Sequence, residues 1–177
     1  MKRRVMYQVA MSADGYIAGP NGEHDWIVPD PAIDFAGIFA QYGTCVMGRG
    51  TWEIAKTRRA LLSGSDQRWI VVSTTLKPED CPGITLVSTG AAEAIAALKA
   101  QPGKDIWLFG GGILFRSLLD AGLVDTVEAT VLPVLLGSGV PLLSPGCRCA
   151  LHLTESKTLS SGVLMLKYAV NPEPAVA

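Results

Sequence analysis

The stretch Val46-Met47-Gly48-Arg49-Gly50-Thr51-Trp52-Glu53 passes from an apolar, strand-like run through two glycines into a helix-like segment. The stretch Leu108-Phe109-Gly110-Gly111-Gly112-Ile113-Leu114 has the same order of strand, glycine turn and helix. Glycine lets a backbone turn sharply and approach a ligand, and the free N–H groups of a helix start favour an anion. One such turn is weak evidence, but the pair predicts a site for the pyrophosphate of a dinucleotide.

Neither turn matches the best-known nucleotide-binding motifs. Gly48-Arg49-Gly50 lacks the third glycine of the Rossmann fingerprint, the triple glycine has the wrong spacing, and no Gly-Lys-Ser or Gly-Lys-Thr forms a P-loop. Arg49 places a guanidinium beside the first helix start, which suits the adenosine 2′-phosphate of NADPH. Ser73, Thr74 and Thr75 follow another apolar strand. They either add hydroxyl groups for the same phosphate or form an ordinary polar strand end.

Strand-like and helix-like segments alternate on both sides of these turns. Strands are expected at residues 5–10, 44–47, 69–73, 84–87, 106–109 and 126–132, and helices at 31–42, from 51 onward, at 91–100 and at 113–121. Asp30 is expected as the N-cap of the 31–42 helix, with Pro31 as its first residue. Residues 151–159 and 163–170 flank Ser160-Ser161-Gly162 and predict an antiparallel hairpin. The chain is therefore expected to be one α/β domain over residues 1–170, with a mostly parallel mixed sheet, helices on both faces and a flexible tail at 171–177.

Composition excludes several classes of partner. The chain has 177 residues, 49% of them apolar, and a formal net charge of −1, which gives no electrostatic reason to expect nucleic acid or an anionic membrane. No run reaches the roughly 18 apolar residues that cross a bilayer, so we expect a soluble, cytoplasmic protein. Cys147-x-Cys149-x-x-His152 lacks a fourth ligand and would place its cysteines on opposite faces of a strand, so no metal site is expected.

Three stretches of the chain resemble the dihydrofolate-reductase superfamily: residues 47–53, the triple glycine, and Ala10-Met11-Ser12-Ala13-Asp14-Gly15-Tyr16-Ile17-Ala18. This last stretch and residues 132–142 are typical of the branch that contains the reductase domain of the riboflavin-biosynthesis bifunctional deaminase-reductase. The resemblance implies the three-layer fold of that superfamily, NADPH as hydride donor, and a homodimer. It also implies a set of cofactor contacts from Gly48, Arg49, Thr51, Ser73, Gly110, Gly111, Gly112, Ile113 and Leu114, with Ala10, Ile17 and Ala18 beside the nicotinamide.

The sequence says less about the residues that would contact the substrate. Reduction of a C=N bond needs a hydride on carbon and a proton on nitrogen, so a carboxylic acid near the substrate is useful. Asp30 and Asp34, four residues apart on the expected helix, are the candidate catalytic acids. Asp34 lies one turn inside that helix, where apolar neighbours would raise its pKa; a solvated helix face is the other interpretation. Aligned on folate reductases, the acid falls instead on Pro31 or Ala32.

Two further residues have both a functional and a structural interpretation. Asp14 either orders the nicotinamide pocket or forms an Asp-Gly turn, and Trp26 either walls the substrate cleft or plugs the packing of a loop. Trp52, Trp69 and Trp107 lie in regular elements and are expected in the core.

The leading functional hypothesis is an NADPH-dependent reductase of a pyrimidine-, aminouracil- or pteridine-like substrate, similar to 5-amino-6-(5-phosphoribosylamino)uracil reductase. Two alternatives stay open at this point. One is true dihydrofolate reductase activity. The other is an NADPH-binding protein without catalysis, because the proton donor is not identified.

Overall fold

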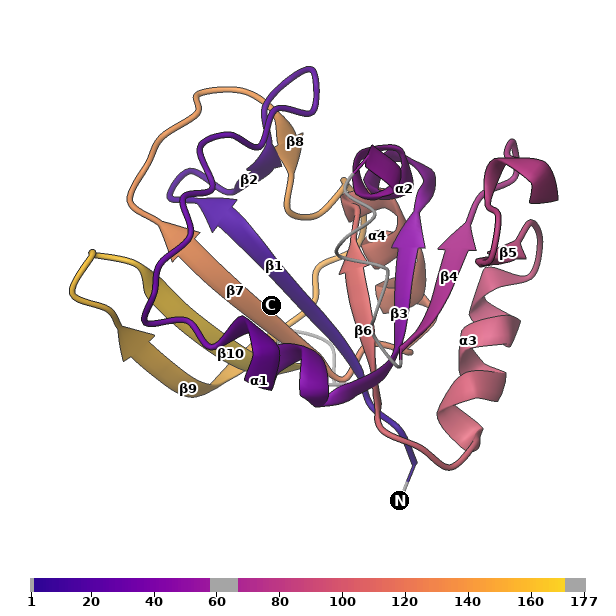
Figure 1. The fold of residues 1–177 in the computed structure, drawn as a ribbon. Coiled ribbons are helices and arrows are strands. Elements are labelled where there is room, and N and C mark those ends of the chain that lie inside the picture. Colours follow the sequence, from indigo (N-terminus) through magenta and orange to yellow (C-terminus); the bar gives the residue numbers. More distant parts are fainter. Residues whose placement is uncertain (1, 58–66, 171–177) are drawn as a thin grey trace.

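The computed structural model describes residues 2–57 and 67–170, so the predicted tail at 171–177 lies outside the described residues. The order of elements follows the sequence pattern (Figure 1). The strands are β1 (Val5–Ser12), β2 (Tyr16–Ala18), β3 (Tyr42–Gly48), β4 (Arg68–Val72), β5 (Thr85–Val87), β6 (Asp105–Gly110), β7 (Thr126–Leu132), β8 (Val140–Pro141), β9 (Leu151–Thr158) and β10 (Leu164–Val170). The helices are α1 (Phe35–Ala40), α2 (Arg49–Ala55), α3 (Ala91–Ala100) and α4 (Gly112–Asp120), with a 3-10 turn at Pro78–Asp80.

Eight of these strands form one mixed sheet in the order β5-β4-β3-β6-β1-β7-β10-β9. The strands from β5 to β7 are parallel, and β10 runs antiparallel to both β7 and β9. This confirms the predicted mostly parallel sheet with a closing hairpin. The short strands β2 and β8 were not predicted from the sequence. They pair with each other in a separate two-stranded sheet.

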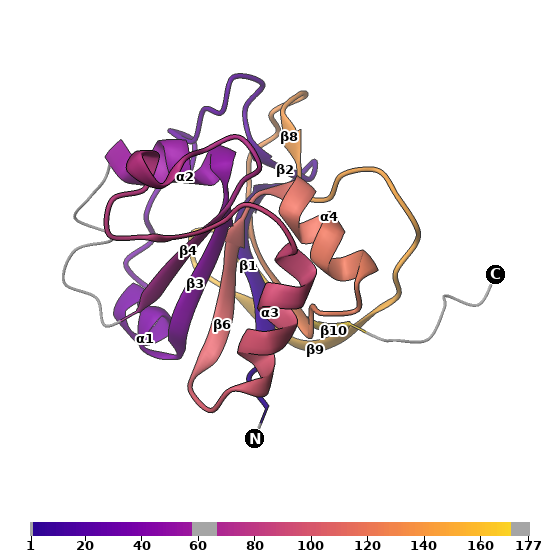
Figure 2. The same ribbon diagram turned by 90° about the vertical axis from the view of Figure 1, so that its right-hand side faces the viewer.

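Helices cover both faces of the sheet, as expected (Figure 2). Val5 and Tyr7 of β1 face α3 and α4, where the rings of Tyr7 and Phe115 stack with centroids 3.8 Å apart. Met6 of β1 lies in the opposite cluster with Trp52 of α2, against which α1 also packs. The faces separate in this way because successive side chains of a strand point in opposite directions. The three tryptophans expected in the core are all buried.

The expected helix at 31–42 begins later than its N-terminal signal predicts. Helix α1 starts at Phe35, and its N-cap is Asp34, whose carboxylate accepts a hydrogen bond from the Gly37 N–H at 2.9 Å. Asp30 is therefore not the N-cap, and Asp34 does not lie inside the helix. The Asp30 carboxylate accepts from the Ala32 N–H at 2.8 Å instead, which closes a local turn before the helix.

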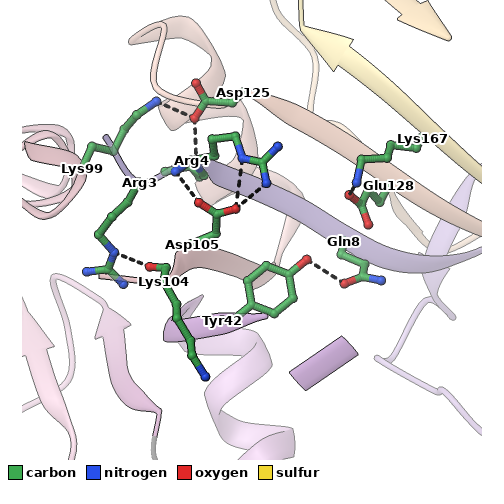
Figure 3. A network of polar contacts seen from close by, with 11 residues as sticks. Arg3, Arg4, Gln8, Tyr42, Lys99, Lys104, Asp105, Asp125, Glu128 and Lys167 are labelled. Carbon is green, nitrogen blue, oxygen red and sulfur yellow. Dashed lines mark hydrogen bonds and ion pairs between the residues drawn. The ribbon is translucent and has the colours of Figure 1, made fainter. Parts of the chain in front are cut away.

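A network of ion pairs joins the N-terminal end of β1 to its neighbours (Figure 3). The Asp105 carboxylate accepts hydrogen bonds from the Arg4 backbone N–H at 2.8 Å and from the Arg4 guanidinium at 2.6 and 3.0 Å. Asp125 accepts from the Val5 N–H at 2.7 Å and from the Lys99 ammonium at 2.6 Å. These contacts hold β1, β6 and the loop before β7 together at the end of the sheet away from the glycine turns.

Asp105→Asn is expected to lower the free energy of unfolding by about 1 kcal/mol at neutral pH, because the pair is partly exposed. Burial by itself would raise the pKa of Asp105, but the Arg4 hydrogen bonds together hold it below the ordinary value of 3.8. The carboxylate therefore stabilises the fold above that value, and this contribution is lost as the pH falls through the lowered folded-state pKa. Urea unfolding at pH values on both sides of this range measures the difference. Glu79→Gln is the control, because Glu79 forms an exposed ion pair with Lys77 at 4.0 Å. If Asp105→Asn lowered the free energy of unfolding equally at both pH values, the stabilisation could not come from the ionised Asp105 carboxylate.

Candidate active site

A cleft of about 1000 Å³ opens above the carboxyl ends of the parallel strands. Crevices at this edge are the usual ligand sites of open α/β sheets. Five segments supply most of the lining: β1 with the loop that follows it, the β3–α2 turn, the end of β4, the β6–α4 turn, and the segment before and within α1. Further residues from β7, β8 and other segments complete it. The residues that the sequence predicted for a cofactor all line it: Ala10, Ile17, Ala18, Gly48, Arg49, Thr51, Ser73, Thr74, Gly110, Gly111, Gly112, Ile113 and Leu114.

Arg49 and the strand end after β4 meet at one end of the cleft. The exposed guanidinium of Arg49 donates to the Thr75 hydroxyl at 3.3 Å, and that hydroxyl lies 3.3 Å from the hydroxyl of the buried Ser73. Ser73 Oγ also accepts from the backbone N–H groups of Thr75 and Leu76, both at 3.2 Å. One cation and two hydroxyl groups are thus held together, which is a suitable set of donors for a phosphate monoester.

The triple-glycine turn packs tightly against its surroundings. Gly110 has a φ of +147°, and a Cβ added there would lie 3.1 Å from the Thr51 hydroxyl. A Cβ added at Gly112 would lie 2.8 Å from the Pro141 carbonyl oxygen. The peptide bond between Gly110 and Gly111 is cis, and Gly111 is the N-cap of α4. The first backbone N–H groups of a helix have no acceptor within it, so this turn presents free donors to the cleft.

Asp14 joins the loop after β1 to the segment between β7 and β8. Its carboxylate accepts from the Ser12 hydroxyl at 2.6 Å, from the Gly137 N–H at 2.7 Å and from the Leu136 N–H at 3.1 Å. The Ser12 hydrogen bond, followed by that from Gly137, lowers the pKa of Asp14. Asp14 is exposed and does not line the cleft. It orders the loop that carries Ile17 and Ala18 into the cleft.

The two candidate acids lie in different environments. Asp34 is exposed, caps α1 and does not line the cleft, so the geometry offers it no contact with a bound substrate. Asp30 lines the cleft, and its carboxylate accepts a short hydrogen bond from the Ser161 hydroxyl in the β9–β10 turn. This bond, with that from the Ala32 N–H, lowers the pKa of Asp30. Asp30 is therefore a carboxylate at neutral pH rather than a ready proton donor.

Trp26 packs against an apolar cluster and does not line the cleft. It lies against the apolar cluster of Leu132, Leu159 and Val163, and its indole N–H donates to the Glu23 carbonyl oxygen at 3.1 Å. Its neighbour His24 does line the cleft, with Nδ1 3.3 Å from the Gly22 carbonyl oxygen. Of these two residues, His24 and not Trp26 lines the cleft.

Several residues that line the cleft were not predicted from the sequence. Gln8 and Thr130 provide polar groups from β1 and β7, and Phe39, Trp107 and Phe109 provide aromatic rings. Gln8 left a signal, because it is a polar residue in an otherwise apolar strand. The rings left none, because aromatic residues in strands and helices are more often part of the core.

The chain is similar to known proteins over nearly its whole length. The family model of the RibD C-terminal domain matches residues 3–165. The Bacillus subtilis (strain 168) protein YyaP is 33% identical over 183 residues, which cover 96% of each chain. A crystal structure from Shewanella sp. PV-4, of a protein assigned to riboflavin biosynthesis, superposes with a TM-score of 0.79 at 27% identity, covering 97% of this chain and 99% of that one.

A more distant structure shares the fold. Dihydrofolate reductase from Enterococcus faecalis superposes with a TM-score of 0.70 at 17% identity, covering 97% of this chain and 99% of that one. Within residues 2–57 and 67–170, no helix is both long enough and apolar enough to span a membrane. The fold is that of dihydrofolate reductase, and the match over nearly the whole length makes this chain a member of the RibD C-terminal domain family.

Proposed function

We propose that the protein is an NADPH-dependent reductase of a small nitrogen heterocycle of the pyrimidine, aminouracil or pteridine type, comparable to 5-amino-6-(5-phosphoribosylamino)uracil reductase. The family and its structural neighbours are reductases. The single observation that carries the finer assignment is one continuous cleft whose lining combines Arg49 and the triple-glycine turn with apolar and aromatic side chains such as Ile33, Phe39 and Phe109. Its size suits a dinucleotide together with a small ring.

The residues of the cleft fit NADPH. Arg49, with Ser73, Thr74 and Thr75 beside it, would hold the 2′-phosphate, and the free N–H groups of residues 110–114 would hold the pyrophosphate. Thr51 contacts the glycine turn and would help to fix it. Ala10, Ile17 and Ala18 would flank the nicotinamide, and bound NADPH would supply the hydride there. NADPH fits because the hydrogen-bond donors for its phosphates already lie close together in the cleft. The glycines also leave no side chain where the pyrophosphate would lie.

The proton path is assigned to cleft residues. Asp30 is the carboxylate available at the substrate end, and since its pKa is lowered, we assign it the role of orienting a water molecule or relaying a proton rather than storing one. His24 lines the same cleft and is a second group able to pass a proton to a ring nitrogen. Asp34 takes no part in this proposal, because it caps α1 outside the cleft.

A non-catalytic NADPH-binding protein is the second candidate. The observation that favours it is the state of the two acids: one lies outside the cleft and the other is held as a carboxylate. This candidate predicts cofactor binding without hydride transfer. True dihydrofolate reductase activity would appear as rapid NADPH consumption with dihydrofolate and tight methotrexate binding.

Fluorescence titration of the purified full-length chain with NADPH, and in parallel with NADH, tests the proposal. The expected result is clear preference for NADPH, followed by loss of NADPH absorbance when an aminouracil or pteridine substrate is added. Binding without turnover on any of these substrates supports the non-catalytic candidate. Absence of binding to both nucleotides would remove the reductase proposal.

The assembly is proposed as a cytoplasmic homodimer. All eight residues of β9 are exposed, and β9 forms one edge of the described sheet. An exposed edge strand has unpaired backbone groups that a second copy can satisfy.

A further inference from the structure

Two of the four cysteines of the chain lie near the surface, two residues apart. Cys147 is exposed and Cys149 is half-buried, and both are free thiols in the segment between β8 and β9. The sequence pattern placed them on opposite faces of a strand, but β9 begins only at Leu151, so strand geometry does not separate their side chains. Neither cysteine lines the cleft. They form a pair of neighbouring thiols that the proposed function does not use.

The other two cysteines are shielded from solvent. Cys45 of β3 and Cys81 are both buried, in the cluster that contains Trp52. Burial raises the pKa of Cys45 to about 12, and it is also the main cause that raises the pKa of Cys81. The thiolate, and not the thiol, is the nucleophile in thiol chemistry. Reagents in solution are therefore expected to reach Cys147 and Cys149 and to leave Cys45 and Cys81 as thiols.

A buried arginine anchors the backbone that leads to the exposed pair. The connection from β8 to β9 runs over the outside of α4 (Figure 2). Arg116 of α4 donates from Nε to the Ser144 carbonyl oxygen at 3.2 Å and from Nη1 to the Cys147 carbonyl oxygen at 3.0 Å. A Cβ added at Gly146 would lie 2.9 Å from Nε of Arg116, so this backbone rests directly on the guanidinium. Cys147 thus stands at the end of an anchored stretch, with its thiol at the surface.

The backbone after Cys147 has more freedom. Arg148 and Cys149 belong to no helix or strand, and among the described residues no backbone–backbone hydrogen bond involves either of them. The Cα atoms of residues two apart are separated by at most about 7 Å, and disulfides form at Cα separations of about 4.4–6.8 Å. A change in the backbone dihedral angles of Arg148 therefore brings the two cysteines into the range of a disulfide.

We propose that Cys147 and Cys149 form a dithiol site that small-molecule disulfides, of the oxidised glutathione type, convert reversibly to an intramolecular disulfide. This inference goes beyond the proposed function and does not depend on it. The thiolate of the more exposed Cys147 attacks one sulfur of the small disulfide, so that a mixed disulfide forms and one small thiol leaves. The thiolate of Cys149 then attacks the Cys147 sulfur, and the second small thiol leaves. The protein loses two electrons and two protons, and the small disulfide gains them.

Thiol labelling tests whether the pair is accessible. The reduced, folded, full-length chain is treated with iodoacetamide, and the labelled cysteines are followed by mass spectrometry over time. Cys147 and Cys149 are expected to react at least about 100-fold faster than Cys45 and Cys81, which are internal controls and should react only after unfolding in urea. Similar rates for all four cysteines in the folded chain, or protection of either member of the pair, would overturn the proposal.

Tryptic mapping tests the disulfide itself. Trypsin cleaves after Arg148, so it separates the peptide 117–148, which carries Cys147, from the peptide 149–157, which carries Cys149. After oxidised glutathione has acted on the folded chain and free thiols are blocked, the two peptides are expected to travel as one species. Dithiothreitol followed by renewed digestion should separate them, and the oxidised chain should run as a monomer in a non-reducing denaturing gel. A stable glutathione adduct, or a disulfide between two chains, would contradict the assignment.

Two variants identify the partners in the disulfide. Cys149→Ser leaves Cys147 alone, so the same treatment is expected to stop at a glutathione adduct on Cys147 that dithiothreitol removes. Cys81→Ala removes a cysteine outside the pair and should form the disulfide as wild type does. If Cys149→Ser still lost two hydrogen atoms without gaining an adduct, Cys147 would have a different partner and the proposed site would be wrong. Loss of the disulfide in Cys81→Ala would have the same meaning.

Discussion

Replacing Arg49 with alanine is expected to weaken NADPH binding by about 10- to 100-fold while NADH binding changes little. The guanidinium is exposed, lies at the end of the cleft and already contacts Thr75 next to Ser73, so its removal leaves hydroxyl groups without a cation. NADH lacks the 2′-phosphate and has nothing to lose from this change. Fluorescence titration of both nucleotides against wild type and variant measures the ratio directly.

Two controls separate charge from contact in the Arg49 experiment. Arg148→Ala removes an exposed arginine that does not line the cleft and should leave both affinities unchanged. Arg49→Lys keeps the charge but not the planar fork of donors, and it should retain part of the preference for NADPH. An equal loss of NADPH and NADH binding in Arg49→Ala would mean that Arg49 holds the shared part of the dinucleotide or the fold.

Gly139→Ala is expected to lower the free energy of unfolding by about 3 kcal/mol. Gly139 has a φ of +155°, and a Cβ added there would overlap the backbone carbonyl oxygen of Ala18. Because the obstructing atom belongs to the backbone, the β2 and β8 segments must separate to admit the methyl group. The same movement displaces Ile17 and Ala18 from the cleft, so weaker NADPH binding should accompany the loss of stability. Urea unfolding and cofactor titration measure the two effects.

Gly83→Ala is the matched control for Gly139→Ala. Gly83 also has a positive φ, of +77°, but a Cβ there would meet nothing within 4 Å. It should cost about 1 kcal/mol for the backbone conformation alone and leave NADPH binding intact. If the two variants lost equal stability, the contact between Gly139 and Ala18 would have no measurable weight.

Local patterns were sufficient to predict most of the elements and their order. The strand at 126–132 and the helix at 91–100 were predicted with the bounds that the structure has. Their apolar residues recur at the spacing of a strand and of a helix, and this periodicity is a local property of the sequence. Glycine-rich strand ends predicted the two turns that line the cleft, since the turn itself requires glycine there. The family resemblance rested on these turns together with residues 10–18 and 132–142.

Local sequence patterns did not predict where α1 starts. Asp30 and Asp34 both have side chains that cap helices, and Asp30 precedes a proline that favours a first helical position. In the structure the Asp30 carboxylate binds both the nearby Ala32 N–H and the hydroxyl of Ser161, a residue 131 positions away. No pattern near residue 30 carries that information, so the sequence predicted the wrong cap.

The fold class, the element order and the proposed phosphate-binding end were thus encoded in short stretches, because backbone turns and alternating side chains act over a few residues. The proposed substrate end was decided by contacts between distant strands. Gln8 acquires its orientation from Tyr42, 34 residues on, and Trp107, 99 residues on, which is both buried and part of the cleft wall. Asp14 finds its partners at Leu136 and Gly137 for the same reason. Side-chain hydrogen bonds form only where the chain brings both partners within about 3 Å, and for these long-range contacts of Gln8 and Asp14 it is tertiary packing that does so.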